Sequence, residues 1–296
     1  MKIIDCRCRY TGAASAAYYT DRMQRLQRLD RIPALESRDD QAFFAEIEAA
    51  GITLAVSVSG LNPGARFGRF HFPDRTTSND ELAAVAREHP SQLLAVGGID
   101  VSNTFHDSLS EVERCVHSLG MKAITIEPGR APGCGVDDPS LFPLYDLCQS
   151  LNITVIPHMG PLGGTSLDHA HPLAIERVAT AFPHLRIICG HGCYPYVREA
   201  IIVASRHENI WLAPDGYFFH LGHDDWMRAI NKNLMNFSHR FLFASAYPLT
   251  PIKAFVENFL RLDWNPDVLE RILFRNAIEA LQLDADPIHR ASFGLG

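Results

Sequence analysis

The chain repeats one pattern almost from end to end, in which a short apolar run is followed by an amphipathic segment. Segments such as 80–88 and 141–149 carry apolar residues every third or fourth position, which is typical of a helix with one buried face. The apolar runs between such segments read as strands: 2–6, 54–59, 93–99, 123–127, 154–158, 187–190, 210–213 and 241–245. Strands that are apolar on both faces and alternate with helices indicate a parallel sheet covered on both sides.

Eight such units within 296 residues favour one closed α/β barrel, the (β/α)8 or TIM barrel, as a single domain over residues 1–296. No Gly-rich dinucleotide motif follows the first strand, which weakens the alternative of an open doubly wound sheet. Two stretches exceed the minimal repeat: a partly helical insertion at 10–38 and a long loop at 61–77. We expect both at the C-terminal face, where barrel enzymes build their sites.

Composition restricts the partners and the compartment. The net charge of −7 argues against nucleic acid or a membrane surface as a partner, and no apolar run approaches membrane-spanning length. The seven cysteines form no Cys-x-x-Cys pair, and Cys148 and Cys189 lie in apolar runs, as buried reduced thiols do. The first ten residues do not read as a signal peptide. We therefore expect a cytoplasmic protein.

The ends of the predicted strands carry a distinctive series of motifs. In chain order they are Ile-Asp-Cys-Arg-Cys-Arg, Ile-Glu-Pro-Gly, Pro-His-Met-Gly, Gly-His-Gly-Cys and Phe-Ala-Ser-Ala-Tyr-Pro, with Leu-Phe-Arg-Asn-Ala opening the last helix. Their order and spacing resemble the amidohydrolase superfamily over essentially the full length. The resemblance is to its decarboxylase-type branch, which includes aminocarboxymuconate-semialdehyde decarboxylase, resorcylate decarboxylases and dicarboxylate lactonases.

The resemblance implies a metal site whose ligands are partly replaced. Members of the branch carry His-x-His on strand one, a His on strand five, often a His on strand six, and an Asp on strand eight. Together these residues hold zinc or manganese. In this chain the strand-one positions are Arg7 and Arg9, the two later histidines are kept as His158 and His191, and the Asp position is Ala246.

The two arginines change the chemistry of these positions. A guanidinium is permanently protonated and has no lone pair for a metal, so Arg7 and Arg9 would repel a cation. We therefore expect no cofactor, with both arginines gripping a carboxylate or an oxyanion of the substrate. The alternative is a structural ion-pair cluster with Asp5 and Glu127. Strand alternation directs the intervening cysteines to the opposite face, where ordinary packing is expected.

Glu127 leaves a second alternative open. With His158 and His191 it forms a Glu/His/His set at the ends of three successive strands. Some sugar-deacetylase branches of the superfamily keep one metal on such a set, and three ligands plus water is a normal catalytic zinc site. This alternative is one zinc ion at Glu127, His158 and His191, although those deacetylases also keep the strand-eight Asp.

Other polar residues are expected on the same face. Asp215 follows strand seven and is a candidate acid or base beside Glu127, while His158 and His191 suit proton transfer. The remaining candidates are expected to bind substrate: Arg130, Arg66, Tyr217 and His220. A cationic mouth on an acidic protein predicts a small anionic organic substrate.

Two classes of function follow. The first is an enzyme acting on a small carboxylated substrate, cyclic or unsaturated, by hydrolysis, decarboxylation or isomerisation. The second is a non-catalytic barrel that binds a small anion or a protein partner. The retention of several proton-active groups at one face favours the enzyme. The family resemblance and the apolar tail at 268–283 also suggest a homodimer.

Overall fold

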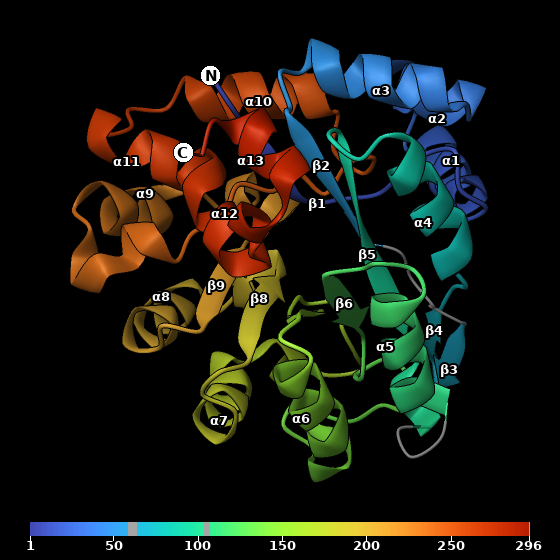
Figure 1. Ribbon diagram of the computed structural model, residues 1–296, viewed down its shortest axis with the longest axis vertical. Helices are drawn as coiled ribbons and strands as arrows, with labels where there is room; N and C mark the ends of the chain where they lie inside the picture. The colour runs from blue at the N-terminus through green and yellow to red at the C-terminus, as the bar shows by residue number, and fades with distance from the viewer. Residues whose placement is uncertain (59–63, 104–106, 296) are drawn as a thin grey trace.

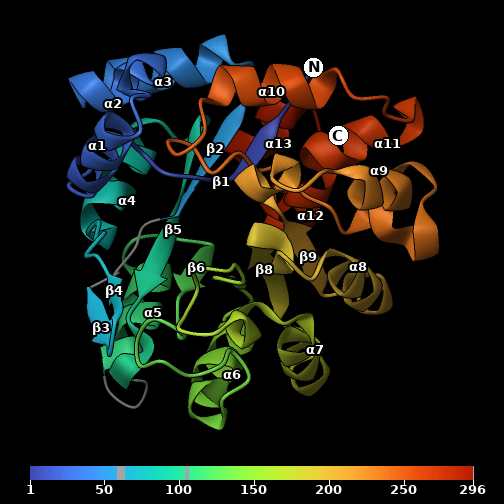
Figure 2. The ribbon, with the colours of Figure 1, turned by 180° about the vertical axis from the view of Figure 1, so that it is seen from behind.

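The computed structural model describes residues 1–58, 64–103 and 107–295. Its centre is a parallel sheet that curls into a barrel, with helices around the outside (Figures 1 and 2). The strands, in their order around the sheet, are β1 (Ile4–Cys8), β2 (Leu54–Val58), β5 (Leu93–Ile99), β6 (Ala123–Ile126), β7 (Thr154–Pro157), β8 (Arg186–Gly190) and β9 (Ile210–Ala213). Nearly every strand residue is buried, which explains the continuous apolar runs in the sequence.

The predicted eighth strand, 241–245, closes the barrel as an irregular segment. On one side the Leu242 N–H donates to the carbonyl of Leu212 in β9 (2.9 Å). On the other side the Cys6 N–H of β1 donates to the Phe243 carbonyl, also at 2.9 Å. The prediction of a single (β/α)8 barrel is confirmed, with the last strand reduced to these few backbone bonds.

Strand β1 runs two residues further than predicted. The apolar run predicts a strand that ends at Cys6, but β1 continues through Arg7 to Cys8, and Arg7 is buried. The pairing of β1 with β2 also shifts register by one residue between Asp5 and Cys8. Such an irregularity bends a strand and redirects its side chains, and here it lies directly at the mouth of the barrel.

Helices alternate with the strands and cover the barrel, as expected. The predicted insertion contains α1 (Ala16–Arg25) and α2 (Pro33–Ser37). The loop after β2 contains a two-stranded hairpin, β3 (Ala65–Phe67) and β4 (Phe70–Phe72). Residues 59–63 lie outside the described part. The helices are α1 (Ala16–Arg25), α2 (Pro33–Ser37), α3 (Asp40–Ala49), α4 (Asn79–Glu88), α5 (Asp107–His117), α6 (Phe142–Ser150), α7 (Pro172–Ala181), α8 (Val197–Arg206), α9 (Asp224–Asn231), α10 (Ile252–Leu260), α11 (Pro266–Glu270), α12 (Asn276–Leu281) and α13 (Pro287–Phe293). None of the helices in the described ranges is long and apolar enough to cross a membrane.

The C-terminal tail covers the end of the barrel opposite the mouth. Thr154, at the start of β7, donates to the Ala280 carbonyl at 2.6 Å, and Lys122, just before β6, pairs with Asp286 at 2.9 Å. Both termini lie close together in Figures 1 and 2. Most apolar residues of 268–283 are buried against the chain's own barrel. They therefore do not supply the exposed apolar face from which we predicted a homodimer. The homodimer stays a prediction.

Candidate active site

Polar side chains gather at the C-terminal ends of the strands. Arg7 lies in β1 and Arg9 directly follows it. Glu127 follows β6, His158 follows β7, and His191 follows β8. Asp215, after β9, joins them. All but Glu127 are buried, and the side chain of the partly buried Glu127 is only 9% exposed. So many buried polar groups at the functional end of a barrel mark a candidate active site.

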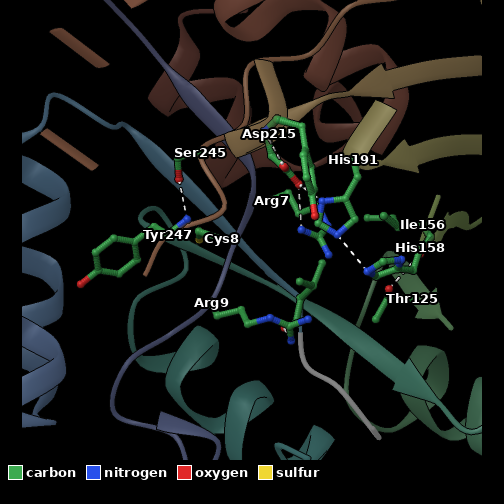
Figure 3. A network of polar contacts seen from close by, with 12 residues as sticks. Arg7, Cys8, Arg9, Thr125, Ile156, His158, His191, Asp215, Ser245 and Tyr247 are labelled. Atoms are coloured by element: carbon green, nitrogen blue, oxygen red, sulfur yellow. Dashed lines mark hydrogen bonds and ion pairs between the residues drawn. The ribbon is translucent and has the colours of Figure 1, made fainter. Parts of the chain in front are cut away.

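Four of these residues form one row, which we call the imidazole row: Arg7, Asp215, His191 and His158 (Figure 3). Arg7 Nη1 donates to Asp215 Oδ2 at 2.8 Å. His191 Nδ1 lies 2.8 Å from the same oxygen, although its direction falls outside hydrogen-bond geometry. The Nε2 atoms of His191 and His158 are 3.0 Å apart. The row therefore runs from a guanidinium through a carboxylate to two facing imidazoles.

Burial determines the protonation states in this row. It lowers the pKa of His158 well below the usual value, and neighbouring His191 adds to the effect. The pKa of His191 is lowered well below its usual value by burial first and by the Arg7 charge second. Burial also raises the pKa of Asp215 to about 6, against the opposing effect of Arg7. Both imidazoles are consequently neutral at pH 7, with lone pairs available.

Glycines of the strand-end motifs make room for the imidazoles. A Cβ on Gly160 would lie 2.7 Å from Cδ2 of His191, and one on Gly163 would lie 2.7 Å from Nδ1 of His158. Side chains cannot approach that closely, so the backbone must be glycine at both positions. The Gly of the Pro-His-Met-Gly motif thus makes room for the histidine of the Gly-His-Gly-Cys motif.

A second group surrounds Glu127, and we call it the guanidinium trio: Arg9, Arg75 and Arg130. Arg75 Nη2 and Arg130 Nε each lie 2.9 Å from Glu127 Oε2, and Arg9 Nη2 lies 3.8 Å from Oε1. Burial alone would raise the pKa of Glu127, but Arg75 and Arg130 outweigh it and hold the pKa well below the usual range. Glu127 is therefore an ionised counter-charge for the trio.

The guanidiniums of the trio are also positioned by aromatic rings. Arg9 lies 5.8 Å from the ring centre of Tyr19 and Arg75 lies 5.9 Å from that of Tyr18, both in α1. Arg130 lies 5.0 Å from the ring centre of Phe72 in β4. Cation–π contacts of this length favour a fixed guanidinium orientation. The insertion after β1 and the hairpin after β2 thus help to build the mouth.

A cavity opens between the imidazole row and the guanidinium trio. Its lining residues are Arg7, Cys8, Arg9, Tyr19, Arg75, His191, Ala246, Tyr247 and Leu249. Ala246 stands where the family resemblance places an Asp, and its backbone is left-handed, with φ of 61°. The cavity therefore borders the very positions at which this chain departs from the family pattern.

The other predicted residues lie at different depths. Tyr217 meets the His191 ring edge-on at 5.1 Å, while His220 is exposed and bonded to the Gly216 carbonyl. Arg66 is exposed in β3, with its Nε 3.5 Å from the Gly68 carbonyl, and does not line the cavity. The structure thus brings Tyr217 to the imidazole row and leaves Arg66 and His220 further out.

Two features differ from the sequence interpretation. Arg75 was missed, because it lies in an aperiodic loop whose sequence gives no signal of a site. Asp5 forms no ion pair with the guanidinium of Arg7: it accepts hydrogen bonds from the Arg7 backbone N–H and from Ser245. The structural alternative for the arginines therefore involves Asp215 and Glu127 instead of Asp5.

A closed barrel with buried arginines, histidines and carboxylates at its C-terminal mouth has the form of a barrel enzyme. Residues 4–283 match the family described as amidohydrolase, so the chain belongs to the amidohydrolase family and is an enzyme of that superfamily.

Individual proteins extend this comparison. An uncharacterised TIM-barrel protein from Bordetella bronchiseptica is 33% identical, with a TM-score of 0.82 over 95% of this chain and 99% of that one. A 2-amino-3-carboxymuconate-6-semialdehyde decarboxylase of Dictyostelium discoideum is 35% identical over 80 residues, which span 27% of this chain and only 22% of that protein's length. A dihydroxybenzoic acid decarboxylase from a Polaromonas species, solved with manganese and 2-nitroresorcinol, shares the fold at 17% identity, with a TM-score of 0.67 over 96% and 97% of the two chains.

The Polaromonas structure corrects one expectation. From the replaced positions on strands one and eight we expected no cofactor, with one zinc ion at Glu127, His158 and His191 as the alternative. A decarboxylase of the same fold carries manganese. This finding contradicts the expectation of no metal, or of zinc alone, which is therefore wrong.

The geometry shows why the Glu/His/His set does not assemble. Glu127 faces the guanidinium trio, and it does not join the two imidazoles as a third ligand within the described ranges. The one group of three potential ligands found there is Asp40, Glu88 and His89, between α3 and α4. Guanidiniums at these distances compete with a metal ion for the Glu127 carboxylate. The position of Glu127 at a strand end does not reveal these contacts.

Two donors in the mouth do fit a divalent ion. The 3.0 Å between the Nε2 atoms of His158 and His191 matches two ligands at right angles around one octahedral ion, each about 2.1 Å from it. Both rings are neutral, and Asp215 lies beside the far nitrogen of His191, as carboxylates do behind metal-bound histidines. Arg7, Arg9 and Ala246 supply no ligand, so the fit is limited to the two imidazoles.

Proposed function

We propose that this enzyme is a carboxy-lyase that removes CO2 from a small carboxylated aromatic or unsaturated substrate. The observation that carries the proposal is the cavity itself, which places the guanidiniums of Arg7, Arg9 and Arg75 beside the imidazole of His191. Buried guanidiniums recognise carboxylates and oxyanions through paired hydrogen bonds. The relatives named as decarboxylases support this reaction over hydrolysis or isomerisation.

The residues of the mouth have different roles in this reaction. Arg7 is held by Asp215 at 2.8 Å and lines the cavity, so it binds and orients the substrate with little freedom of its own. His158 and His191 would hold a divalent ion, which when bound polarises a substrate oxygen. The aromatic walls supplied by Tyr19 and Tyr247 limit the access of water to the cavity.

The test is a direct assay of CO2 release. The purified protein, supplied with manganese, would be incubated with a panel of hydroxybenzoates and unsaturated diacids, with CO2 and the protonated product measured together. We expect release from at least one compound. An Arg7→Ala variant that is folded should lose roughly 100- to 1000-fold in turnover, as enzymes do when one preorganised donor is removed.

Surface variants provide the control. Arg261 is 72% exposed at its side chain and pairs with Glu257 far from the mouth, so Arg261→Ala should leave turnover unchanged. Hydrolysed or isomerised product without CO2, under the same conditions, would replace the lyase with another reaction of the superfamily. Binding without any conversion across the panel would instead favour a barrel that only binds small anions.

A further inference from the structure

We propose that Arg9 and Arg75 form a holding site for a second anionic group, one that the substrate keeps throughout the reaction. The substrate is then a dicarboxylate or a related dianion and not a simple monocarboxylate. This inference rests on the proposed function, because it assigns one part of the same mouth. It makes Arg75, which the sequence did not single out, a residue that determines specificity.

The first observation is the charge around Glu127. Three guanidiniums face this one carboxylate, so the guanidinium trio carries two positive charges more than its counter-ion. In the imidazole row, by contrast, the positive charge of Arg7 is matched by Asp215, whose Oδ2 lies 2.8 Å from Arg7 Nη1. The other nearby buried carboxylate, Asp5, is occupied by Ser245 and a backbone N–H. The excess charge is thus concentrated on one side of the cavity.

The second observation is a set of unused hydrogen-bond donors. Nε of Arg75 and Nη1 of Arg130 are buried and have no hydrogen-bond partner within the described part of the chain. Arg9 Nη1 donates to the Val58 carbonyl at 2.9 Å, but the nearest contact of Arg9 with Glu127, at 3.8 Å, exceeds hydrogen-bond length. Buried donors of this kind are costly unless something pairs with them. An anionic group brought by the substrate would balance the excess charge and could pair with the free donor of Arg75, which lines the cavity.

The third observation is position. Arg9 and Arg75 line the same cavity as Arg7 and His191, whereas Glu127 does not line it. One small molecule in this cavity therefore meets a guanidinium surplus at one end and the imidazole row at the other. The two ends can contact two different groups of one substrate at the same time.

The chemistry then decides which group belongs where. In decarboxylation the bond from carbon to the carboxylate breaks, CO2 leaves, and the electron pair stays on the carbon, which takes a proton from water. The carboxylate loses its negative charge as this happens. Guanidiniums gripping it would stabilise the ground state more than the transition state and would slow the reaction. The guanidinium trio therefore suits a carboxylate that remains.

The experiment compares inert probes of one or two charges. Binding of benzoate, phthalate, isophthalate and terephthalate to the manganese-supplied protein would be measured by titration calorimetry. We expect the best dicarboxylate to bind roughly 10- to 100-fold more tightly than benzoate, the range of one charged hydrogen-bonding contact. Arg75→Met, which keeps an unbranched apolar stem and loses the charged guanidinium, should abolish that preference, while the surface variant Arg261→Met should keep it.

The possible outcomes separate this inference from the proposed function. Equal affinity for benzoate and all three dicarboxylates would overturn the holding site, and so would a folded Arg75→Met that keeps the preference. If Arg75→Met does not fold, Arg75→Gln and the wild-type comparison carry the test. A preference for dicarboxylates without CO2 release from any compound would support the holding site and reject the lyase. CO2 release with equal efficiency from mono- and dicarboxylates would support the lyase and reject the holding site.

Discussion

Replacing Glu127 with glutamine is the most informative perturbation of this site. The substitution keeps size and shape but removes the charge that two guanidiniums contact at 2.9 Å with side chains less than 10% exposed. Removing one partner of a buried ion pair leaves an uncompensated charge and typically costs about 3–5 kcal/mol. At about 2.1 cal/mol/K per residue, unfolding 296 residues has an entropy of roughly 0.6 kcal/mol/K, so we expect the Tm to fall by about 5–8 °C.

The assay is thermal and urea unfolding of four proteins at pH 7: wild type, Glu127→Gln, Arg75→Met and the double variant. Arg75→Met should cost less than Glu127→Gln, because Arg130 still pairs with the carboxylate. The double variant should be more stable than the sum of the single changes predicts, since it removes one of the stranded guanidiniums.

The pH dependence supplies an independent check. The pKa of Glu127 is held well below its usual range, so its contribution to stability is present above the unfolded pKa and is lost as pH falls through the folded pKa. The penalty of Glu127→Gln should therefore be full at pH 7 and shrink only in acid. A Glu127→Gln protein within about 1 kcal/mol of wild type at pH 7, or strictly additive double-variant data, would refute the counter-charge role.

Three further predictions concern other parts of the mouth. Arg7→Lys should lower turnover almost as much as Arg7→Ala, because lysine lacks the planar fork that contacts Asp215 and substrate together; normal single-turnover rates in a stable Arg7→Lys protein would contradict this. Burial raises the pKa of Asp5 to about 6, so this group should lower the stability of the wild type by roughly 3 kcal/mol as the pH rises from 4 to 6. Urea unfolding of Asp5→Asn should show a correspondingly weaker dependence of stability on pH, and an unchanged pH dependence would reject the prediction. Elemental analysis after manganese loading should show that His158→Ala and His191→Ala each lose most of the bound ion, and full retention by both would place the ion elsewhere.

Much of the architecture follows from local sequence patterns. Continuous apolar runs predict strands buried on both faces, and eight of them alternating with helices predict a barrel, because helices must cover both sides of a parallel sheet. The same logic places strand-end residues such as His158 and His191 at one mouth, since all the strands of the barrel run in the same direction.

The partners of those residues were decided only by the tertiary structure. Arg75 contacts Glu127 across 52 residues of sequence, from a loop without periodicity, and Arg7 contacts Asp215 across 208 residues. Because Arg75 and Arg130 take the Glu127 carboxylate, the Glu/His/His set that spacing suggested does not form. Sequence alone determined that the strand-end side chains reach the mouth, because the direction of a strand end is a local property; it did not place loop residues such as Arg75. The fold decided which charges pair there, because the strength of an ion pair depends on distance and burial, and both arise only when remote segments meet.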